Sequence, residues 1–318
     1  RGSRDLPFID LVGSVCHSNE LPNAVFSDVS PNPTDEDIAR GKTVFNNGGH
    51  DGVIAIGGGS GMDAGKAISL VGRNDADLWD FDYDQPEFPD LSPGSFVPLI
   101  CVPTTAGTGA ETESTAMLTD TVQGVKRCIW HTTQKPLLAI LDPEVTVNLP
   151  ADLTAWTGCD ALVHAIEAFS VPDWNPLCDG LALEAIRLIS GSLESAVAHG
   201  DDLEARGAML VGSCLAGISF LKGLGLVHAM SHMVGAACDT HHGLTNAVLL
   251  PPVLLYNKNA LEEKVPLICK AMGLPSEDFH SMYSSVVELL DALDIPRGLS
   301  DLDVPESELD SIAQKAYT

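Results

Sequence analysis

Residues 226–243 read LVHAMSHMVGAACDTHHG and contain four of the ten histidines of this 318-residue chain. His228 and His232 are four residues apart, so on a helix they lie one turn apart on the same face. His241 and His242 follow as an adjacent pair. Because the neighbours of the first pair are mostly apolar, the stretch predicts a buried helix that presents imidazoles on one face.

A second stretch, GCDALVHAIEAF at 158–169, places Asp160 and His164 at the same spacing. A carboxylate on an otherwise apolar helix is costly unless it is paired or bound to a metal. A buried Asp–His pair and satisfied core histidines are the plainer interpretations. One carboxylate with several imidazoles is typical of Fe²⁺ or Zn²⁺ held between helices, and the absence of a thiolate argues against a structural zinc.

Apolar runs with strand character occur only in the amino-terminal half, at 24–26, 52–56, 97–102 and 137–141. From about residue 149 apolar residues recur at helical spacing instead, at 151–169, 181–199, 202–221, 227–238, 244–256, 261–272, 280–293 and 305–317. The sequence therefore predicts two domains. Residues 1–150 form an α/β dinucleotide-binding domain with a parallel sheet, and residues 151–318 form an all-helical domain that binds metal and substrate.

Two turns in the amino-terminal half have the composition of phosphate-binding loops. GGGSG at 57–61 follows a predicted strand and precedes a predicted helix, which directs free backbone N–H groups at a phosphate. PTTAGTGAE at 103–111 follows another strand with three hydroxyls and two glycines. Neither matches the G-x-G-x-x-G or the P-loop pattern, and a tight turn without a ligand is the alternative.

The composition excludes some partners. With 17 Lys plus Arg against 44 Asp plus Glu, the net charge is −27 and the pI is about 4.4. We expect no nucleic acid and no membrane as partner, because phosphate binding needs basic patches and no apolar run approaches the ~18 residues of a membrane span. The eight cysteines form no CxxC pair and are expected to be reduced thiols of a cytoplasmic protein.

These motifs give the sequence a family resemblance: it resembles the iron-containing (group III) alcohol dehydrogenases, which have a dehydroquinate synthase-like fold. The matching stretches span most of the chain. They are PNPT at 31–34, GGGSGMDAGKA at 57–67, PTTAGTGAETE at 103–113, GCDALVHAIEAF at 158–169 and LVHAMSHMVGAACDTHHGLTNAVLLP at 226–251. The family's first strand and its last helical turns have no counterpart in this sequence. We therefore expect that the sequence is part of a longer protein or belongs to a shortened member of the family.

The resemblance implies roles for individual residues. The implied metal ligands are Asp160, His164, His228 and His242, with His232 near the nicotinamide. The implied cofactor-binding residues are Gly58, Gly59, Ser60, Asp63, Thr104, Thr105, Thr108 and Lys126. Ser27 stands where many NAD-preferring members have an Asp that repels a 2′-phosphate, so either NAD or NADP is expected. His241 has no implied role.

The sequence thus predicts a metal-dependent oxidoreductase that transfers hydride between NAD(P) and a small alcohol or aldehyde. Fe²⁺, or alternatively Zn²⁺, acts as a Lewis acid on the alcohol oxygen. Asp160 and His228 hold the ion, and His232 relays the proton. We expect a homodimer or a higher homo-oligomer. The alternatives are a zinc polyol dehydrogenase, a maleylacetate reductase-like enzyme, a dehydroquinate synthase-type lyase, or a non-enzymatic protein with a vestigial site.

Overall fold

The computed structural model describes residue 4 and residues 6–317, and its chain divides into two compact units. The amino-terminal unit comprises the described residues up to Thr104 together with Ala110–Val145. The helical unit comprises Thr105–Gly109 and Thr146 onward. The turn that follows the second predicted strand is therefore shared: Thr104 belongs to the amino-terminal unit and the next five residues to the helical unit.

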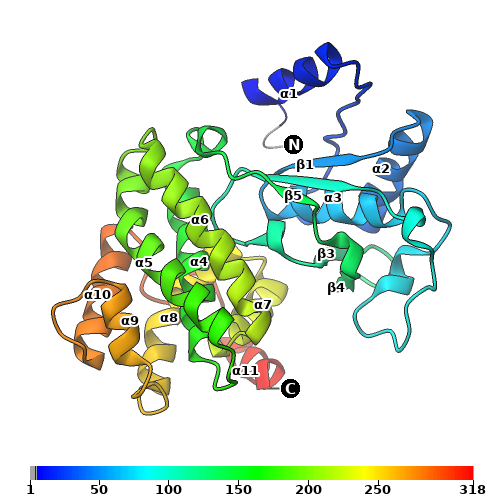
Figure 1. The fold of residues 1–318 in the computed structure, drawn as a ribbon. Coiled ribbons are helices and arrows are strands. Elements are labelled where there is room, and N and C mark those ends of the chain that lie inside the picture. The colour runs from blue at the N-terminus through cyan, green and yellow to red at the C-terminus, as the bar shows by residue number, and fades with distance from the viewer. Residues whose placement is uncertain (1–3, 5, 318) are drawn as a thin grey trace. The chain divides into compact units, whose positions relative to one another are not determined.

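A three-stranded parallel sheet organises the amino-terminal unit, in the order β1 (Val53–Gly57), β2 (Leu99–Pro103), β5 (Leu138–Ala139) (Figure 1). Val53 pairs with Leu99 and Gly57 with Pro103, so β1 and β2 end side by side. Helix α3 (Gly59–Val71) leaves β1 at once and packs back onto β1 and β2. The strands at 52–56 and 97–102 and the parallel sheet are confirmed, and the third strand is shorter than predicted.

The rest of this unit contains two helices and a hairpin. Helix α1 spans Pro7–Ser18, and α2 spans Asp35–Asn47 behind a capping box formed by Thr34 and Asp37. The hairpin of β3 (Thr115–Asp120) and β4 (Val125–Trp130) was not predicted from the sequence. The predicted strand at 24–26 is wrong, because that segment runs extended without pairing to any strand among the described residues.

The helical unit confirms the predicted change of character after residue 149. Its helices are α4 (Ala151–Ser170), α5 (Pro176–Ala198), α6 (Leu203–Ser219), α7 (Leu226–Cys238), α8 (His242–Asn257), α9 (Val265–Ala271), α10 (Phe279–Ala292) and α11 (Leu309–Tyr317). Helix α4 packs against α5, α6 and α8, and residues 157–169 are all buried. A helix enclosed in this way must be apolar all round, so its few polar side chains stand out.

Short 3₁₀ helices connect the longer elements of both units. They are η1 (Leu78–Phe81), η2 (Pro93–Ser95), η3 (Ala110–Thr112), η4 (Thr132–Gln134), η5 (Pro143–Thr146), η6 (Phe220–Lys222), η7 (Leu299–Leu302) and η8 (Glu306–Glu308).

One described helical stretch, Leu203–Lys222, is long and apolar enough to cross a membrane by length and composition. Half of this stretch is buried inside the helical unit. Core helices of soluble proteins can have the same length and hydropathy. The stretch also contains Arg206, a buried guanidinium that donates to the Gly200 carbonyl at 3.0 Å and to the Thr154 hydroxyl at 2.8 Å. These contacts mark it as a packed core helix.

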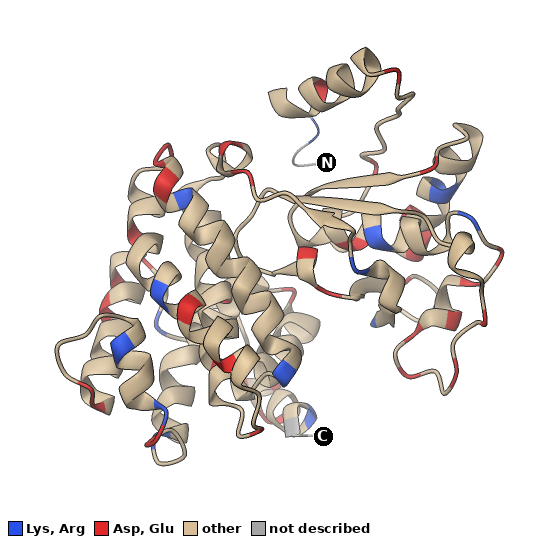
Figure 2. Ribbon diagram, viewed as in Figure 1, with Lys and Arg blue, Asp and Glu red and all other residues tan. Residues whose placement is uncertain are grey.

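Acidic side chains are spread over both units, with Lys and Arg far fewer (Figure 2). Several of the basic groups are already bound to carboxylates. Arg127, for example, donates to Asp82 at 2.6 Å and to Asp120 at 3.0 Å. With so few basic residues against so many acidic ones, the sequence offers little positive charge to an anionic partner.

The contact between α3 and β1 gives a prediction for stability. A Cβ at Gly65 would lie 2.4 Å from the Ala55 Cβ, so Gly65→Ala should overpack this contact and cost about 1–3 kcal/mol. At Gly191, in the interior of α5, no atom lies within 4 Å of an added Cβ, and Gly191→Ala should gain about 0.5–1 kcal/mol. Thermal unfolding of both variants checks the pair. A Gly65→Ala variant as stable as the parent would contradict the packing described.

Candidate active site

Three helices of the helical unit bring polar side chains to one point. Helix α4 supplies Asp160 and His164, α7 supplies His228, and α8 begins with His242. The first pair lies one turn apart on the same face of α4, as the spacing predicted. Asp160, His164 and His228 are buried, and His242 is partly exposed.

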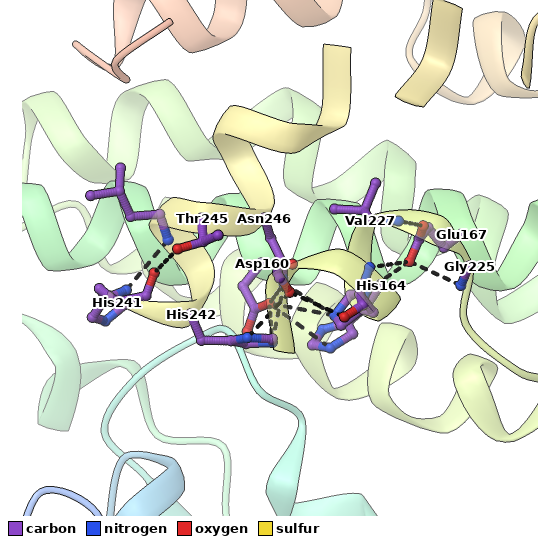
Figure 3. Close-up of polar contacts among 12 residues, drawn as sticks. Asp160, His164, Glu167, Gly225, Val227, His241, His242, Thr245 and Asn246 are labelled. Carbon is purple, nitrogen blue, oxygen red and sulfur yellow. Dashed lines mark hydrogen bonds and ion pairs between the residues drawn. The ribbon is translucent and has the colours of Figure 1, made fainter. Parts of the chain in front are cut away.

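The four side chains present their ligand atoms to one another (Figure 3). One atom from each lies within 4.8 Å of all the others. The Asp160 Oδ1 is 3.9 Å from His164 Nε2, 3.8 Å from His228 Nε2 and 3.6 Å from His242 Nε2. These separations exceed hydrogen-bonding distance but suit four ligands around one small ion, since metal–nitrogen and metal–oxygen bonds are about 2.0–2.2 Å long.

The protonation states favour a bound cation. Burial raises the pKa of Asp160, but the facing His164, His242 and His228 imidazoles and the Asn246 amide outweigh it and lower the pKa to about 2. Burial and the neighbouring His164 hold the pKa of His228 well below its ordinary value of 6.5. A neutral imidazole beside an ionised carboxylate is the state in which both groups bind a metal.

His164 supports the same conclusion. Its ring stacks on His228 with centroids 4.5 Å apart. Its Nδ1 is buried without a hydrogen-bond partner among the described residues. The donor set therefore fits Fe²⁺ or Zn²⁺, both of which bind imidazole and carboxylate.

Glu167 and Asn246 were missed from the sequence. Glu167, also on α4, accepts from backbone N–H groups at the start of α7, and its Oε2 lies 2.7 Å from the His228 ring Nδ1. Burial raises its pKa, although the backbone bonds oppose the shift. The spacing of Asp160, His164 and Glu167 was the available signal, because residues i, i+4 and i+7 share one helical face.

Asn246 lies one turn after His242 on α8 and is fully buried. Its Nδ2 is 2.7 Å from Asp160 Oδ1 and 3.1 Å from Nε2 of both His228 and His242. Its Oδ1 is buried with no hydrogen-bond partner among the described residues. The Asn246 amide, which was not predicted as a site residue, thus contacts three of the four candidate ligand atoms.

The other two histidines of the opening stretch differ from each other. His232 is exposed on α7, with its ring centroid 5.0 Å from that of His242 and 6.0 Å from that of His228. His241 lies apart from the four ligand atoms, as Figure 3 shows. Its Nδ1 accepts from the Leu244 backbone N–H, which caps α8, and its ring packs near Trp156 at 4.9 Å.

The glycine-rich turn of the amino-terminal unit has the expected form. Gly58 is the N-cap of α3, and no described side chain caps the helix, so its first backbone N–H groups are available to an anion. Gly59 and Ser60 form the first turn, and the Ser60 hydroxyl donates to the Pro31 carbonyl. Asp63 accepts from the Met117 N–H at 3.3 Å, and burial raises its pKa to about 7.

The remaining predicted cofactor residues are distributed over both units. In the amino-terminal unit, Thr104 is buried and extends the β1–β2 pairing through its N–H to the Gly57 carbonyl at 2.9 Å. Lys126 is exposed on β4, and Ser27 is half-buried in the extended segment before α2. Thr105 and Thr108 belong to the helical unit.

The segment that holds Thr105 and Thr108 packs tightly within the helical unit. A Cβ at Gly107 would lie 2.7 Å from the Thr157 side chain of α4, and one at Gly109 would lie 2.7 Å from the Gly217 backbone of α6. Gly109 also has a φ of +64°, which favours glycine. These close contacts fix the two hydroxyl-bearing residues against the helices.

The adjacent histidines provide a matched test of the ligand set. His242→Ala should lower the affinity for Co²⁺ or Zn²⁺ at least about 100-fold, because it removes a ligand atom rather than a supporting group. His241→Ala should leave the affinity unchanged and cost up to about 1 kcal/mol of stability through the lost helix cap. Titration of the metal-free protein against a chelating indicator measures both. Equal losses in the two variants would contradict the assignment.

Both the amino-terminal and the carboxyl-terminal parts of the chain match known protein families. Residues 1–143 match the iron-containing alcohol dehydrogenases, and residues 154–318 match the C-terminal part of the Fe-containing alcohol dehydrogenase family. The probable alcohol dehydrogenase EutG of Escherichia coli (strain K12) is 41% identical over 286 residues, which cover 89% of this chain and 71% of that protein.

Two further similarities extend over more of the chain. The NAD-dependent methanol dehydrogenase of Bacillus methanolicus is 37% identical over 306 residues, which cover 93% of this chain and 78% of that protein. The crystal structure of a 1,3-propanediol oxidoreductase superposes with a TM-score of 0.93 at 36% identity, covering 99% of this chain and 83% of that one. The predicted fold and oxidoreductase class are confirmed. The predicted cofactors, iron and NAD, agree with the iron-containing family and with its NAD-dependent relative. The chain belongs to the iron-containing alcohol dehydrogenase family.

Proposed function

We propose that this protein transfers hydride between NAD(P) and a small alcohol or aldehyde, with one Fe²⁺ held by Asp160, His164, His228 and His242. The observation that carries the proposal is the convergence of these four ligand atoms from α4, α7 and α8 within 4.8 Å. Zn²⁺ fits the same donors, and a zinc polyol dehydrogenase is the second candidate.

Each residue of the helical unit has a separate task in this proposal. When bound, the divalent ion would supply Lewis acidity toward the alcohol oxygen, and the dinucleotide would supply a hydride acceptor. The Asp160 carboxylate stays ionised because its pKa is about 2, and it provides the one full negative charge among the four ligands. His228 stays neutral and offers a nitrogen lone pair. His232, exposed beside His242, takes the alcohol proton on a ring nitrogen and passes it to water.

The amino-terminal unit binds the dinucleotide in this proposal. The backbone N–H groups at Gly59 and Ser60 bind the pyrophosphate with the positive end of the α3 dipole. Gly58 permits close approach, and Asp63, Thr104 and Lys126 contribute further polar groups.

We also place the enzyme in the cytoplasm as a homo-oligomer. None of the eight cysteines, all of which lie in the described part of the chain, forms a disulfide, which suits a reducing compartment. Light scattering during size-exclusion chromatography measures the oligomeric state, and a monomer would contradict that part of the proposal.

Replacing Asp160 tests the reaction directly. Asp160→Ala should lose bound metal and NAD(P)H oxidation with short aldehydes together, because it removes the anionic ligand. Asp152→Ala, an exposed carboxylate on the first turn of the same helix, should retain both. Metal analysis after anaerobic purification and a coupled rate measurement give the two readouts. Activity retained in Asp160→Ala would exclude the metal mechanism.

Cofactor preference gives a second test, at Ser27. The neighbouring Asp28 pairs with Arg40 at 3.2 Å, so it already has a cationic partner. A new carboxylate in Ser27→Asp should repel the 2′-phosphate and raise the KM for NADP about tenfold or more, while the KM for NAD changes little. Ser27→Asn is the neutral control. Equal effects on both cofactors would show that Ser27 does not face the ribose.

A further inference from the structure

The helix that carries His228 and His232 has an unusual beginning. The N-cap of α7 is Gly225, which has no side chain to satisfy the first N–H groups of the helix. The carboxylate of Glu167, sixty residues earlier on α4, satisfies them instead. Its Oε1 accepts from the Val227 N–H at 2.7 Å, and its Oε2 accepts from the Gly225 N–H at 3.0 Å.

The same carboxylate reaches the metal ligand itself. Glu167 Oε2 lies 2.7 Å from the Nδ1 of His228 and 3.3 Å from the His228 backbone N–H. An N–H at Nδ1 leaves the lone pair on Nε2, the atom that lies 3.8 Å from Asp160 Oδ1. One side chain thus contacts both the start of α7 and the ring of its ligand, and Figure 3 shows Glu167 beside Gly225 and Val227.

We propose that Glu167 is a positioning residue, which locks His228 in the Nδ1–H tautomer and couples that tautomer to the N-terminus of α7. This inference rests on the proposed metal function. It explains why position 225 is a glycine, since an added Cβ would lie 2.7 Å from Glu167 Oε1. It also explains why an acid is buried on a helix that already carries Asp160.

The chemistry requires a carboxylate. Glu167 accepts from the backbone N–H groups of Gly225, Val227 and His228, and these bonds use both of its oxygens as acceptors. Glutamine has nearly the same shape but offers one oxygen and one NH₂ group. In the first orientation the NH₂ group faces the Val227 N–H of α7, and in the second it faces the Nδ1 of His228. The second orientation favours the Nε2–H tautomer, which cannot bind a metal through Nε2.

The test compares Glu167→Gln with a matched cap variant, Asp202→Asn. Asp202 caps α6 by accepting from the Glu204 and Ala205 N–H groups and contacts no candidate ligand. Both variants should lower the unfolding midpoint of the metal-free protein. Glu167→Gln alone should weaken Co²⁺ affinity by about 10–100-fold and alter the visible spectrum of bound Co²⁺. A Glu167→Gln variant with parental affinity and spectrum would overturn the inference.

The parent protein supplies a second measurement, independent of whether the variant folds. Long-range ¹H–¹⁵N correlation spectra of the metal-free protein report the tautomer of each histidine, with His228 assigned through His228→Gln. An Nδ1–H signal is expected, and an Nε2–H signal would overturn the inference. Absence of Co²⁺ binding by the parent would instead overturn the proposed function, so the two failures are distinguishable.

Discussion

The buried carboxylate of Asp160 is the constraint on which the helical unit depends. It sits on a helix whose residues 157–169 are all buried, and the ionisable partners within 4.0 Å of it in the described part of the chain are histidines rather than Lys or Arg. Leaving such a charge uncompensated would cost several kcal/mol. Three imidazole nitrogens and an amide are gathered around it, and the group as a whole has the composition of a metal site.

Close helix packing makes this gathering possible. Gly243, directly after His242, would place a Cβ 2.3 Å from the Trp156 carbonyl oxygen, so glycine lets the start of α8 approach α4. Gly225 has the same role where α7 meets Glu167. The starts of α7 and α8 therefore each meet α4 at a glycine, Gly225 against the Glu167 side chain and Gly243 against the Trp156 backbone.

Much of this arrangement could be predicted from the sequence. The pairs Asp160 with His164 and His228 with His232 follow helical spacing, and the change from strands to helices near residue 149 follows the apolar period. Asn246 could have been found at i+4 from His242, but an amide in an apolar run gives little chemical signal. Because its role depends on Asp160, 86 residues earlier, only the tertiary structure reveals it.

The errors in the amino-terminal unit have a similar origin. Residues 24–26 have strand composition but no partner strand among the described residues, whereas the β3–β4 hairpin is held by pairing between Thr115 and Trp130 and a turn at Gly124 with φ +68°. Strand formation depends on neighbours that local composition does not specify.

The metal site itself is tested most directly by X-ray diffraction at the iron edge from crystals loaded anaerobically with Fe²⁺. If these four residues bind one ion, a single anomalous peak should lie within about 2.0–2.3 Å of a donor atom from each of Asp160, His164, His228 and His242. A peak elsewhere, or no peak, would contradict this assignment of the metal ligands.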